Sequence, residues 1–358
     1  MVQVNLPKRR WSWGKGDSSH LVVTYNVDDE GTTPHPSSPR HTTVTVPLYP
    51  CRSHRRRGWA KLHSSAPTVL AYHLLDGPSA SPTLLLFRTR PTTDWMRDIP
   101  DYTPLGAMVI PGTHESCALY GYFISQCQQV ATPIAQQLED GVRFFDIRLK
   151  VEDGKLLTYH GIRPERSTLQ HELSTLSAFL RAHPSETLVV SIKEETPPWD
   201  VSFSRLVYEA FTEPAWRDLY RIDSFLDIPE KAITVVAHLI PTLVPTTSPL
   251  TPPPSPFPSM SSATTQTPWT ISFTSASNFP LAAPTWIAKG LGTASWLGLG
   301  VEGVNPRIVK WLLLTASEGL RPRATVLSDF YRQAPGGGEF GEGGDRGLAE
   351  LLVALNFV

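Results

Sequence analysis

The chain has 358 residues, a net charge of −1 and 41% hydrophobic residues. That length holds one large domain or two ordinary ones, and the near-zero charge gives no argument for a nucleic-acid partner or for strong attraction to membranes. Three cysteines, Cys51, Cys117 and Cys127, are too few for a disulfide framework and lack metal-site spacing, which favours a reducing compartment.

Neither a targeting signal nor a membrane span is recognisable in the sequence. Residues 1–14 lack the apolar centre of a signal peptide, and no run reaches the ~18 apolar residues that a transmembrane helix needs. We therefore expect a monomer that is cytoplasmic or bound peripherally at a membrane surface, with no transmembrane segment.

Residues 1–92 predict an N-terminal extension that is either β-rich or partly disordered. Strand-like runs at 20–25 and 42–46 are separated by a stretch rich in Ser, Thr and Pro. The basic run at 52–57, next to Trp59, fits a solvated loop better than a patch for anionic lipid head groups with Trp59 at the interface.

From residue 93 to 358 short apolar runs alternate with helical patterns. Such alternation indicates βαβ units, a parallel sheet and a TIM-type (β/α)8 barrel. Between 241 and 268 the chain is rich in Pro, Ser and Thr, which predicts a disordered insertion and leaves room for a distorted or incomplete barrel. The predicted strands are 107–110, 142–145, 156–159, 187–192, 233–237, 269–273 and 324–330, and the predicted helices are 132–141, 169–183, 203–220, 305–319 and 348–355.

Polar residues capable of proton or phosphate chemistry follow several of these strands. In a (β/α)8 barrel the active site forms where the carboxyl ends of the strands meet the following loops. The residues at such ends are His114, Asp146, Arg148, His160, Lys193 and Asp329.

Four ordered motifs carry a family resemblance. They are IPGTHES at 110–116, QLEDGVRFFDIR at 137–148, YHG at 159–161 and HPSET at 183–187, which leads to SIK at 191–193. Together they resemble the X domain of bacterial-type phosphatidylinositol-specific phospholipase C, within the superfamily of phospholipase C-like phosphodiesterases. The likeness is good over about residues 95–195 and patchy elsewhere. It implies a TIM barrel and a phosphoric diester hydrolase that cleaves phosphatidylinositol to diacylglycerol and a cyclic inositol phosphate.

The resemblance also implies roles for individual residues. Cleavage assisted by a neighbouring hydroxyl needs a base, an acid and positive charge around the phosphate oxygens. By resemblance His114 is the base, His160 is the acid and Asp329 is the partner of the base. Arg148 stabilises the phosphate and Lys193 contacts the head group. Asp146 orients Arg148 or the second histidine, and Glu115, where bacterial relatives usually have Asp, lies near Arg148.

No metal or other cofactor is expected. Calcium-dependent relatives carry acids at the positions that match Arg148 and Lys193, and Ca²⁺ needs six to eight oxygen ligands. A guanidinium can hold a phosphate without a metal. Glu194 and Glu195 suggest a solvated turn, and Trp286 and Trp296 fit either a membrane-contacting rim or the core.

Two alternatives to the enzyme remain open at this point. A catalytically weak or inactive barrel could bind lipid head groups or serve as an interaction module, although binding alone does not need a paired acid and base. A glycerophosphodiester phosphodiesterase would need a cluster of metal-binding acids, which the sequence does not show. Glycosylated phosphatidylinositol anchors also remain possible substrates.

Overall fold

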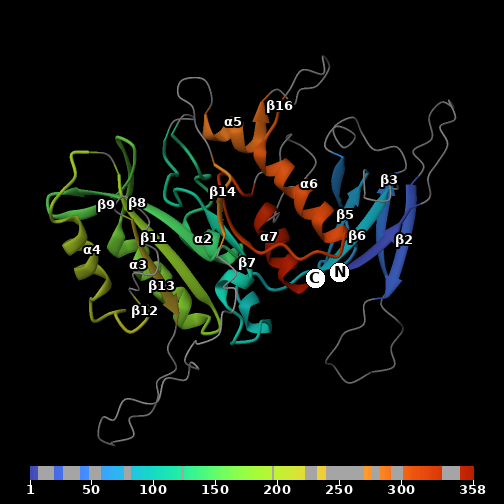
Figure 1. Ribbon diagram of the computed structural model, residues 1–358, viewed down its shortest axis with the longest axis horizontal. Coiled ribbons are helices and arrows are strands. Elements are labelled where there is room, and N and C mark those ends of the chain that lie inside the picture. Colours follow the sequence, from blue (N-terminus) through green and yellow to red (C-terminus); the bar gives the residue numbers. More distant parts are fainter. Residues whose placement is uncertain are drawn as a thin grey trace, which may run out of the picture.

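A computed structural model of the chain shows one curled sheet flanked by helices, with a second, N-terminal sheet beside it (Figure 1). The structure describes residues 1–6, 20–26, 41–47, 58–75, 82–121, 125–195, 197–221, 232–238, 270–275, 283–291, 301–332 and 347–358. The basic run at 52–57, the 241–268 segment and Trp296 lie outside these residues.

The central sheet has a parallel core of five strands. Their order is β14, β17, β7, β8 and β11, and each neighbouring pair is parallel. The strands are rich in buried Val, Ile, Leu and Phe because helices and loops cover both faces. Their bounds are β7 (Val109–Thr113), β8 (Phe144–Glu152), β11 (Thr187–Glu194), β14 (Ile271–Phe273) and β17 (Ala324–Ser328).

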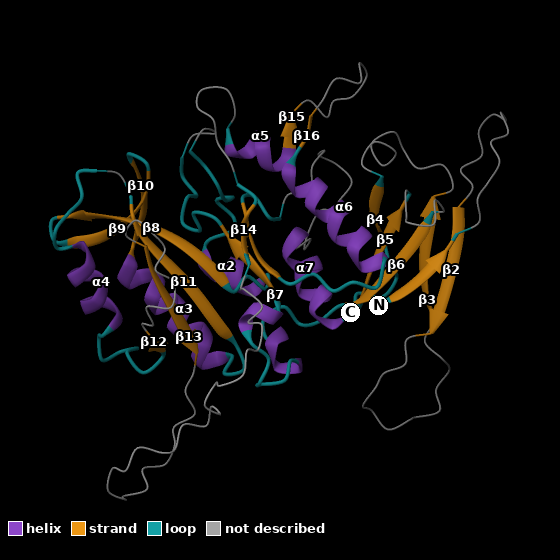
Figure 2. Ribbon diagram, viewed as in Figure 1, coloured by secondary structure: helices purple, strands orange, loops and turns teal. Residues whose placement is uncertain are grey.

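The expectation of a parallel sheet throughout was wrong for part of the chain. Next to β11 the strands β13 (Ala232–His238) and β12 (Tyr220–Arg221) continue the sheet in antiparallel fashion. β9 (Lys155–His160) folds back on β8 as a hairpin and pairs with β10 (Arg163–Thr168). In the described residues the sheet therefore forms a curled half-barrel that ends at β14 and β12 (Figure 2).

The β8–β9 hairpin has a clear local cause. Glu152 pairs with Lys155 across a two-residue loop, Asp153-Gly154, and both loop residues have positive φ, at 48° and 71°. Asp-Gly is a preferred pair for this kind of turn because both residues tolerate the left-handed region. This dipeptide is the signal by which sequence reasoning could have found the hairpin.

The helices pack on the sheet through apolar stripes. α3 begins at Thr168, whose hydroxyl oxygen accepts from the His171 amide, and buries Leu169, Leu173, Leu176 and Leu180. α4 is shorter than predicted because turns replace its second half. The bounds are α2 (Ile134–Glu139), α3 (Leu169–Ala182), α4 (Phe203–Phe211), α5 (Pro284–Lys289), α6 (Val304–Ser317) and α7 (Gly347–Ala354), with 3₁₀ turns η1 (Trp95–Asp98), η2 (Leu105–Ala107) and η3 (Leu355–Phe357).

An antiparallel sheet from the N-terminal residues shares its core with α6 and α7. Trp59 and Tyr72 from this sheet pack with Leu312 and Leu352 of the two helices. Trp59 is 2% exposed and its indole N–H donates to the Pro306 carbonyl at 3.1 Å, which argues against the less favoured alternative, a Trp59 at a lipid interface. The strands are β1 (Val2–Asn5), β4 (Trp59–Leu62), β5 (Val69–Leu74) and β6 (Thr83–Arg88); β2 (His20–Asn26) and β3 (His41–Pro47) form a separate ribbon, and β15 (Gly290–Leu291) pairs with β16 (Val301–Glu302).

Buried polar contacts fix β7, the strand that leads to the first histidine. The Val109 N–H donates to Asn356 Oδ1 at 2.9 Å, and Asn356 Nδ2 donates back to the Val109 carbonyl at 2.7 Å. Arg143, fully buried just before β8, donates to Glu186 at 2.8 Å and to four backbone carbonyls. These contacts hold the starts of β7 and β8 in place.

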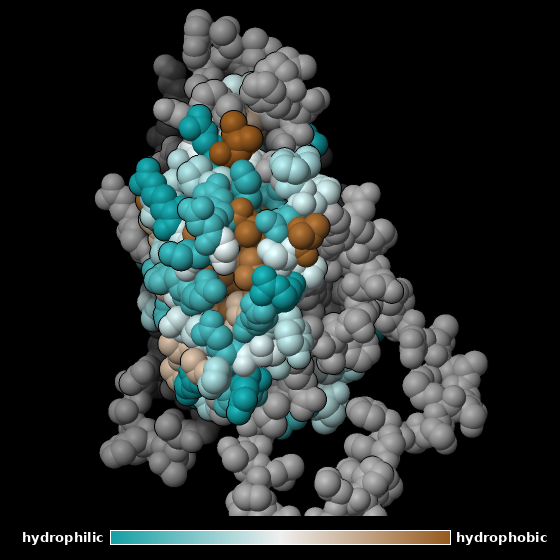
Figure 3. Space-filling model, turned by 90° about the vertical axis from the view of Figure 1, so that its left-hand side faces the viewer, coloured by the Kyte–Doolittle hydropathy of each residue, from teal (hydrophilic) through white to brown (hydrophobic). Residues whose placement is uncertain are grey.

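One face of the molecule can be followed in a space-filling view. The face at the end with α4 and β9 is mainly hydrophilic, with hydrophobic residues at separate positions (Figure 3). Trp286 on α5 is 38% exposed. Among the described helices, none combines the length and the apolar character that crossing a bilayer requires.

Candidate active site

The first histidine of the site, His114, follows β7 directly and is held by the neighbouring last strand. Because β17 pairs in parallel with β7, Ser328 lies opposite Thr113, and the next residues, His114 and Asp329, meet side by side. His114 Nδ1 lies 3.0 Å from Asp329 Oδ1, so the predicted contact is confirmed. Gln128 Nε2 donates to the carbonyls of both His114 and Ser328, at 2.9 Å each, and ties the two strand ends together.

The charges around His114 favour its protonated form. Burial lowers the pKa of the imidazole, but the hydrogen bond to Asp329 and the charges of Asp329, Glu115 and Asp146 outweigh that effect. The pKa of His114 is therefore raised above its ordinary value of 6.5. An imidazole in this setting accepts a proton more readily than a free one.

Arg148 stands at the centre of the site and is fixed by carboxylates. Its Nε and Nη2 donate to the two oxygens of Asp146, both at 3.0 Å, which orients the guanidinium plane. Glu195 accepts from Nη1 at 3.4 Å. Burial lowers the pKa of Arg148, yet the neighbouring carboxylates raise it above its usual value, so the side chain keeps its charge.

Glu115 lies between the two histidines rather than only near Arg148. Its Oε1 is 3.8 Å from His114 Nε2 and 4.0 Å from Arg148 Nη1, and its Oε2 is 3.2 Å from His160 Nε2. The backbone at Glu115 has a φ of +43°, which turns the side chain inward. Burial raises the pKa of this carboxyl to about 7, against the opposing charges of His160, His114 and Arg148.

The second histidine, His160, reaches the site through the hairpin. It is the last residue of β9, which runs antiparallel to β8, so the return strand carries it back beside Arg148. The sequence predicted His160 at the end of a parallel strand. The direction of the strand was wrong, but His160 does lie in the site. His160 Nδ1 forms a short hydrogen bond with the Ser125 carbonyl, and its Nε2 faces Glu115.

Lys193 and Phe273 complete the rim. Lys193 on β11 pairs in register with Arg148 on β8, which places the two cations on neighbouring strands. Phe273, at the end of β14, is 56% exposed, and its ring meets the His114 ring edge-on at 5.9 Å between centroids. Sequence reasoning matched the stretch around Phe273 to the family without giving this side chain a role.

The prediction of a solvated turn at Glu194 and Glu195 was wrong. Glu194 is 4% exposed and accepts from the Asp200 amide at 2.6 Å. Glu195 contacts Arg148 and also accepts from the Gly161 amide at 2.8 Å, which fastens the turn after His160. β11 runs to Glu194, one residue beyond Lys193, so the sheet and not a turn holds this position.

Two side-chain groups in the described part of the chain have the composition of a metal site. One joins His114, Cys127 and Asp329, and the other joins Glu115, Cys127 and His160. Within each group the ligand atoms lie within 4.8 Å of one another. Cys127 belongs to both groups, and no predicted role covers it.

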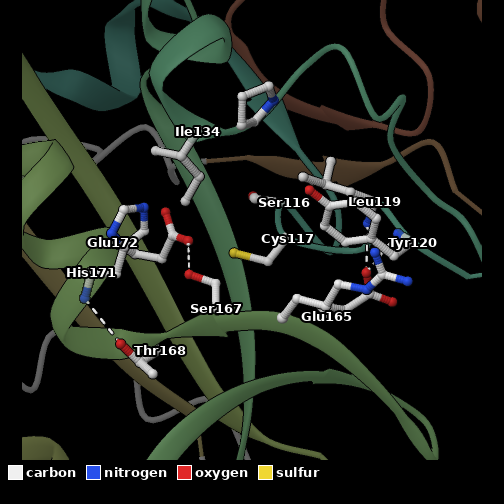
Figure 4. Close-up of a pocket in the computed structure, with 12 residues that line it drawn as sticks. Ser116, Cys117, Leu119, Tyr120, Ile134, Glu165, Ser167, Thr168, His171 and Glu172 are labelled. Carbon is white, nitrogen blue, oxygen red and sulfur yellow. Dashed lines mark hydrogen bonds between the residues drawn. The ribbon is translucent and has the colours of Figure 1, made fainter.

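A separate cavity of about 300 Å³ lies beside the loop that follows Glu115 (Figure 4). Its lining includes Cys117, Glu165 and Glu172, and does not include His114, His160, Arg148 or Lys193. Glu165 Oε2 accepts from the amides of Leu119 and Tyr120, both at 2.8 Å, and so holds the loop from outside the site.

Residues 103–220 match the family described as phosphatidylinositol-specific phospholipase C, X domain. Over these residues the chain is similar to that X domain. The matched region includes β7, β8, β9 and β11, and with them His114, His160, Arg148 and Lys193. Asp329 and Phe273 lie on or directly after later strands, outside the matched region.

Curated relatives support this assignment over part of their length. The 1-phosphatidylinositol phosphodiesterase of Listeria monocytogenes is 36% identical over 111 residues, or 29% of this chain and 33% of that protein. The enzyme of the same name from Staphylococcus aureus is 28% identical over 140 residues, or 36% of this chain and 43% of that protein. The chain thus matches about a third to two fifths of the length of these relatives.

The fold is shared more widely than the sequence. A solved structure of Staphylococcus aureus phosphatidylinositol-specific phospholipase C superposes with a TM-score of 0.50 and 16% identity, over 75% of this chain and 98% of that one. The likeness therefore extends beyond the X domain.

Proposed function

We propose that the protein is a phospholipase C that cleaves phosphatidylinositol to diacylglycerol and a cyclic inositol phosphate, by general acid–base catalysis between two histidines. One observation carries this proposal. The Nε2 atoms of His114 and His160 face the same carboxylate, Glu115, beside Arg148, while their Nδ1 atoms are engaged elsewhere. A paired base and acid next to a fixed guanidinium is what phosphodiester cleavage requires.

In the first step His114 acts as the base. Asp329 accepts a hydrogen bond from Nδ1, so the lone pair of His114 lies on Nε2 and can take the proton of the inositol 2-hydroxyl. The hydroxyl oxygen then bonds to phosphorus. Arg148, held in plane by Asp146, faces the negative charge that develops on the phosphate oxygens.

His160 acts as the acid in the same step. With Nδ1 hydrogen-bonded to the Ser125 carbonyl, the protonated ring presents its second N–H from Nε2. As the bond between phosphorus and the glycerol oxygen breaks, this proton passes to the departing diacylglycerol. The proton gained by His114 and the proton lost by His160 balance, and solvent restores both rings.

Head-group recognition is proposed for Lys193 and Phe273. Lys193 adds a second positive charge on the strand next to Arg148, and the exposed face of Phe273 lies beside His114, where the sugar ring would sit. The same residues would suit an inositol that carries a glycan. We extend the proposal to a sheet that closes into a TIM-type barrel distorted by its antiparallel strands, in line with the fold likeness.

The substrate implies work at a membrane surface. Three apolar residues close to the site in sequence are well exposed: Ile162 by 82%, Trp199 by 45% and Val201 by 103%. Ile162 follows the turn at Gly161, which Glu195 holds beside Arg148. We propose that these side chains meet the lipid surface reversibly and that the protein acts as a monomer.

Phosphorus NMR of the protein with phosphatidylinositol in mixed micelles tests the proposal. A cyclic inositol phosphate should appear in the presence of a chelator, with no gain from added calcium, and should fall below detection in His114→Ala. Turnover that needs calcium would contradict the role given to Arg148. A folded protein that binds phosphatidylinositol vesicles without making product would favour a head-group binding module instead.

A further inference from the structure

A thiol at the centre of the site has no part in the proposed chemistry. Cys127 is 1% exposed, and its sulfur lies within 4.8 Å of the possible ligand atoms of both histidine–carboxylate pairs. Burial raises the pKa of this thiol, and the charges of Asp329 and Glu115 add to the effect. This direction disfavours the thiolate as long as nothing binds the sulfur.

The group of Glu115, Cys127 and His160 is the better prepared of the two for a metal ion. His160 Nδ1 is hydrogen-bonded to the Ser125 carbonyl, so the proton of the neutral ring lies on Nδ1 and the lone pair of Nε2 points into the site. Backbone carbonyls orient metal-binding histidines in the same way. Glu115 Oε2 is buried and takes part in no hydrogen bond, although it lies 3.2 Å from that nitrogen. In the other group, His114 Nδ1 is already bonded to Asp329 at 3.0 Å.

We propose that Glu115, Cys127 and His160 bind a thiophilic divalent cation such as Zn²⁺. On binding, the Cys127 thiol loses its proton to solvent and its sulfur bonds to the metal, together with His160 Nε2 and one Glu115 oxygen. Three protein ligands of the S, N and O type, with one open position, match the tetrahedral preference of zinc. Thiolate ligation selects zinc or cobalt over Ca²⁺ and Mg²⁺, which prefer oxygen.

Occupation of this site regulates the reaction negatively. The metal takes the Nε2 lone pair of His160, so the ring can no longer carry the proton that the leaving group needs. This consequence rests on the proposed function, whereas metal binding itself does not. Inhibition should therefore follow Zn²⁺ and not Ca²⁺ or Mg²⁺.

Cobalt substitution gives a readout that does not depend on activity. The full chain, free of affinity tags and carrying Cys51→Ser, is titrated with Co²⁺ and followed by absorption. A sulfur-to-cobalt charge-transfer band should appear in this protein and in Cys117→Ser, and should be absent from Cys127→Ser. Zn²⁺ should displace the cobalt and abolish the band. Cobalt binding without the band, or a band that survives in Cys127→Ser, overturns the proposal.

Further measurements provide for the case that Cys127→Ser does not fold, and they separate metal binding from its effect on lipid cleavage. The far-ultraviolet circular dichroism of Cys127→Ser is compared with that of Cys117→Ser. If Cys127→Ser is unfolded, His160→Gln is used instead, because it keeps the thiol and removes one proposed ligand. Cobalt affinity should fall by at least 10–100-fold, because the loss of a residue that only orients a ligand already has that effect. Unchanged affinity in His160→Gln contradicts the site. If the protein cleaves phosphatidylinositol, Zn²⁺ should inhibit Cys117→Ser fully. If it shows no turnover, the cobalt band alone still tests whether the metal site exists.

Discussion

At the scale of single residues, the site places a carboxylate beside both histidines and beside Arg148. Asp329 contacts His114, Asp146 contacts Arg148 and Glu115 lies against His160, so these three side chains have a counter-charge close by. The arrangement separates the two histidines chemically, because one has a strong hydrogen bond from Nδ1 to a carboxylate and the other to a backbone carbonyl. We infer the division between base and acid from this difference.

Asp329→Asn should lower turnover while leaving the fold intact. The amide keeps the shape of the carboxylate but loses its charge, and can turn its NH₂ toward Nδ1 and favour the wrong tautomer of His114. We expect kcat to fall by about 10²–10⁴-fold, the usual contribution of general acid–base catalysis. Rates of product formation measure this, with Asp101→Asn, at an exposed position, as the matched control. A loss of less than tenfold would contradict the role of Asp329.

Glu172 should make stability depend on pH. Burial raises its pKa above 4.5, against the hydrogen bond from Ser167 and the charge of His171. In the window above 4.5 and below the raised pKa, the folded protein keeps a proton that the unfolded chain has lost, so stability falls as pH rises through that window. Glu172→Gln stays neutral and can still accept from Ser167.

Melting temperatures at several pH values test this expectation. The advantage of Glu172→Gln over the unchanged protein should be small near pH 4 and should grow as the pH rises toward neutrality. Glu318→Gln, at an exposed position, is the control and should show no such trend. An advantage that is the same at every pH would mean that burial of the charge is not the cause.

At the scale of elements, the sequence indicates strands well and their partners poorly. The runs that became β7, β8, β11 and β17 are short, apolar and rich in β-branched or aromatic residues, and their length and flanking Gly or Pro identify them as strands. The direction of a strand depends on which neighbouring strand it pairs with in the folded sheet. The sequence of β13 therefore did not reveal that this strand runs antiparallel to β11. The contact of Asp329 with His114 was predictable, since first and last strands adjoin in this fold. The position of Glu115 depends on one positive φ and was not predictable.

Asn356→Ala should destabilise the protein by releasing the start of β7. The substitution leaves the Val109 N–H and carbonyl buried without partners, each at a cost of about 1–3 kcal/mol. We expect the free energy of unfolding to fall by about 2–4 kcal/mol. Urea unfolding measures it. A loss below about 1 kcal/mol would show that these two backbone groups do not depend on Asn356.

At the scale of the whole molecule, the N-terminal sheet and the C-terminal helices form one core. Leu70 and Phe87 of the sheet pack with Leu313 and Leu352, and Val109 of β7 belongs to the same cluster. A boundary near residue 92, as the change in sequence character predicts, therefore does not coincide with a gap in packing.

Leu352→Ala should destabilise both sheets together. The side chain is 1% exposed, and its truncation leaves a cavity between the two sheets that costs about 2–5 kcal/mol. Hydrogen exchange in increasing denaturant should show peptides from β5 and β11 becoming unprotected at the same denaturant concentration, and the substitution should shift both. Loss of protection in β5 alone would establish an independently unfolding N-terminal domain.

The pairing of His114 with Asp329 joins residues that are 215 positions apart. At ~5–20 residues per second, a ribosome needs roughly 10–40 s to pass from one to the other. For that interval the growing polypeptide carries the histidine without its carboxylate, and β7 lacks a neighbour on one side. On the proposed function, lipid cleavage begins only after translation has passed Asp329.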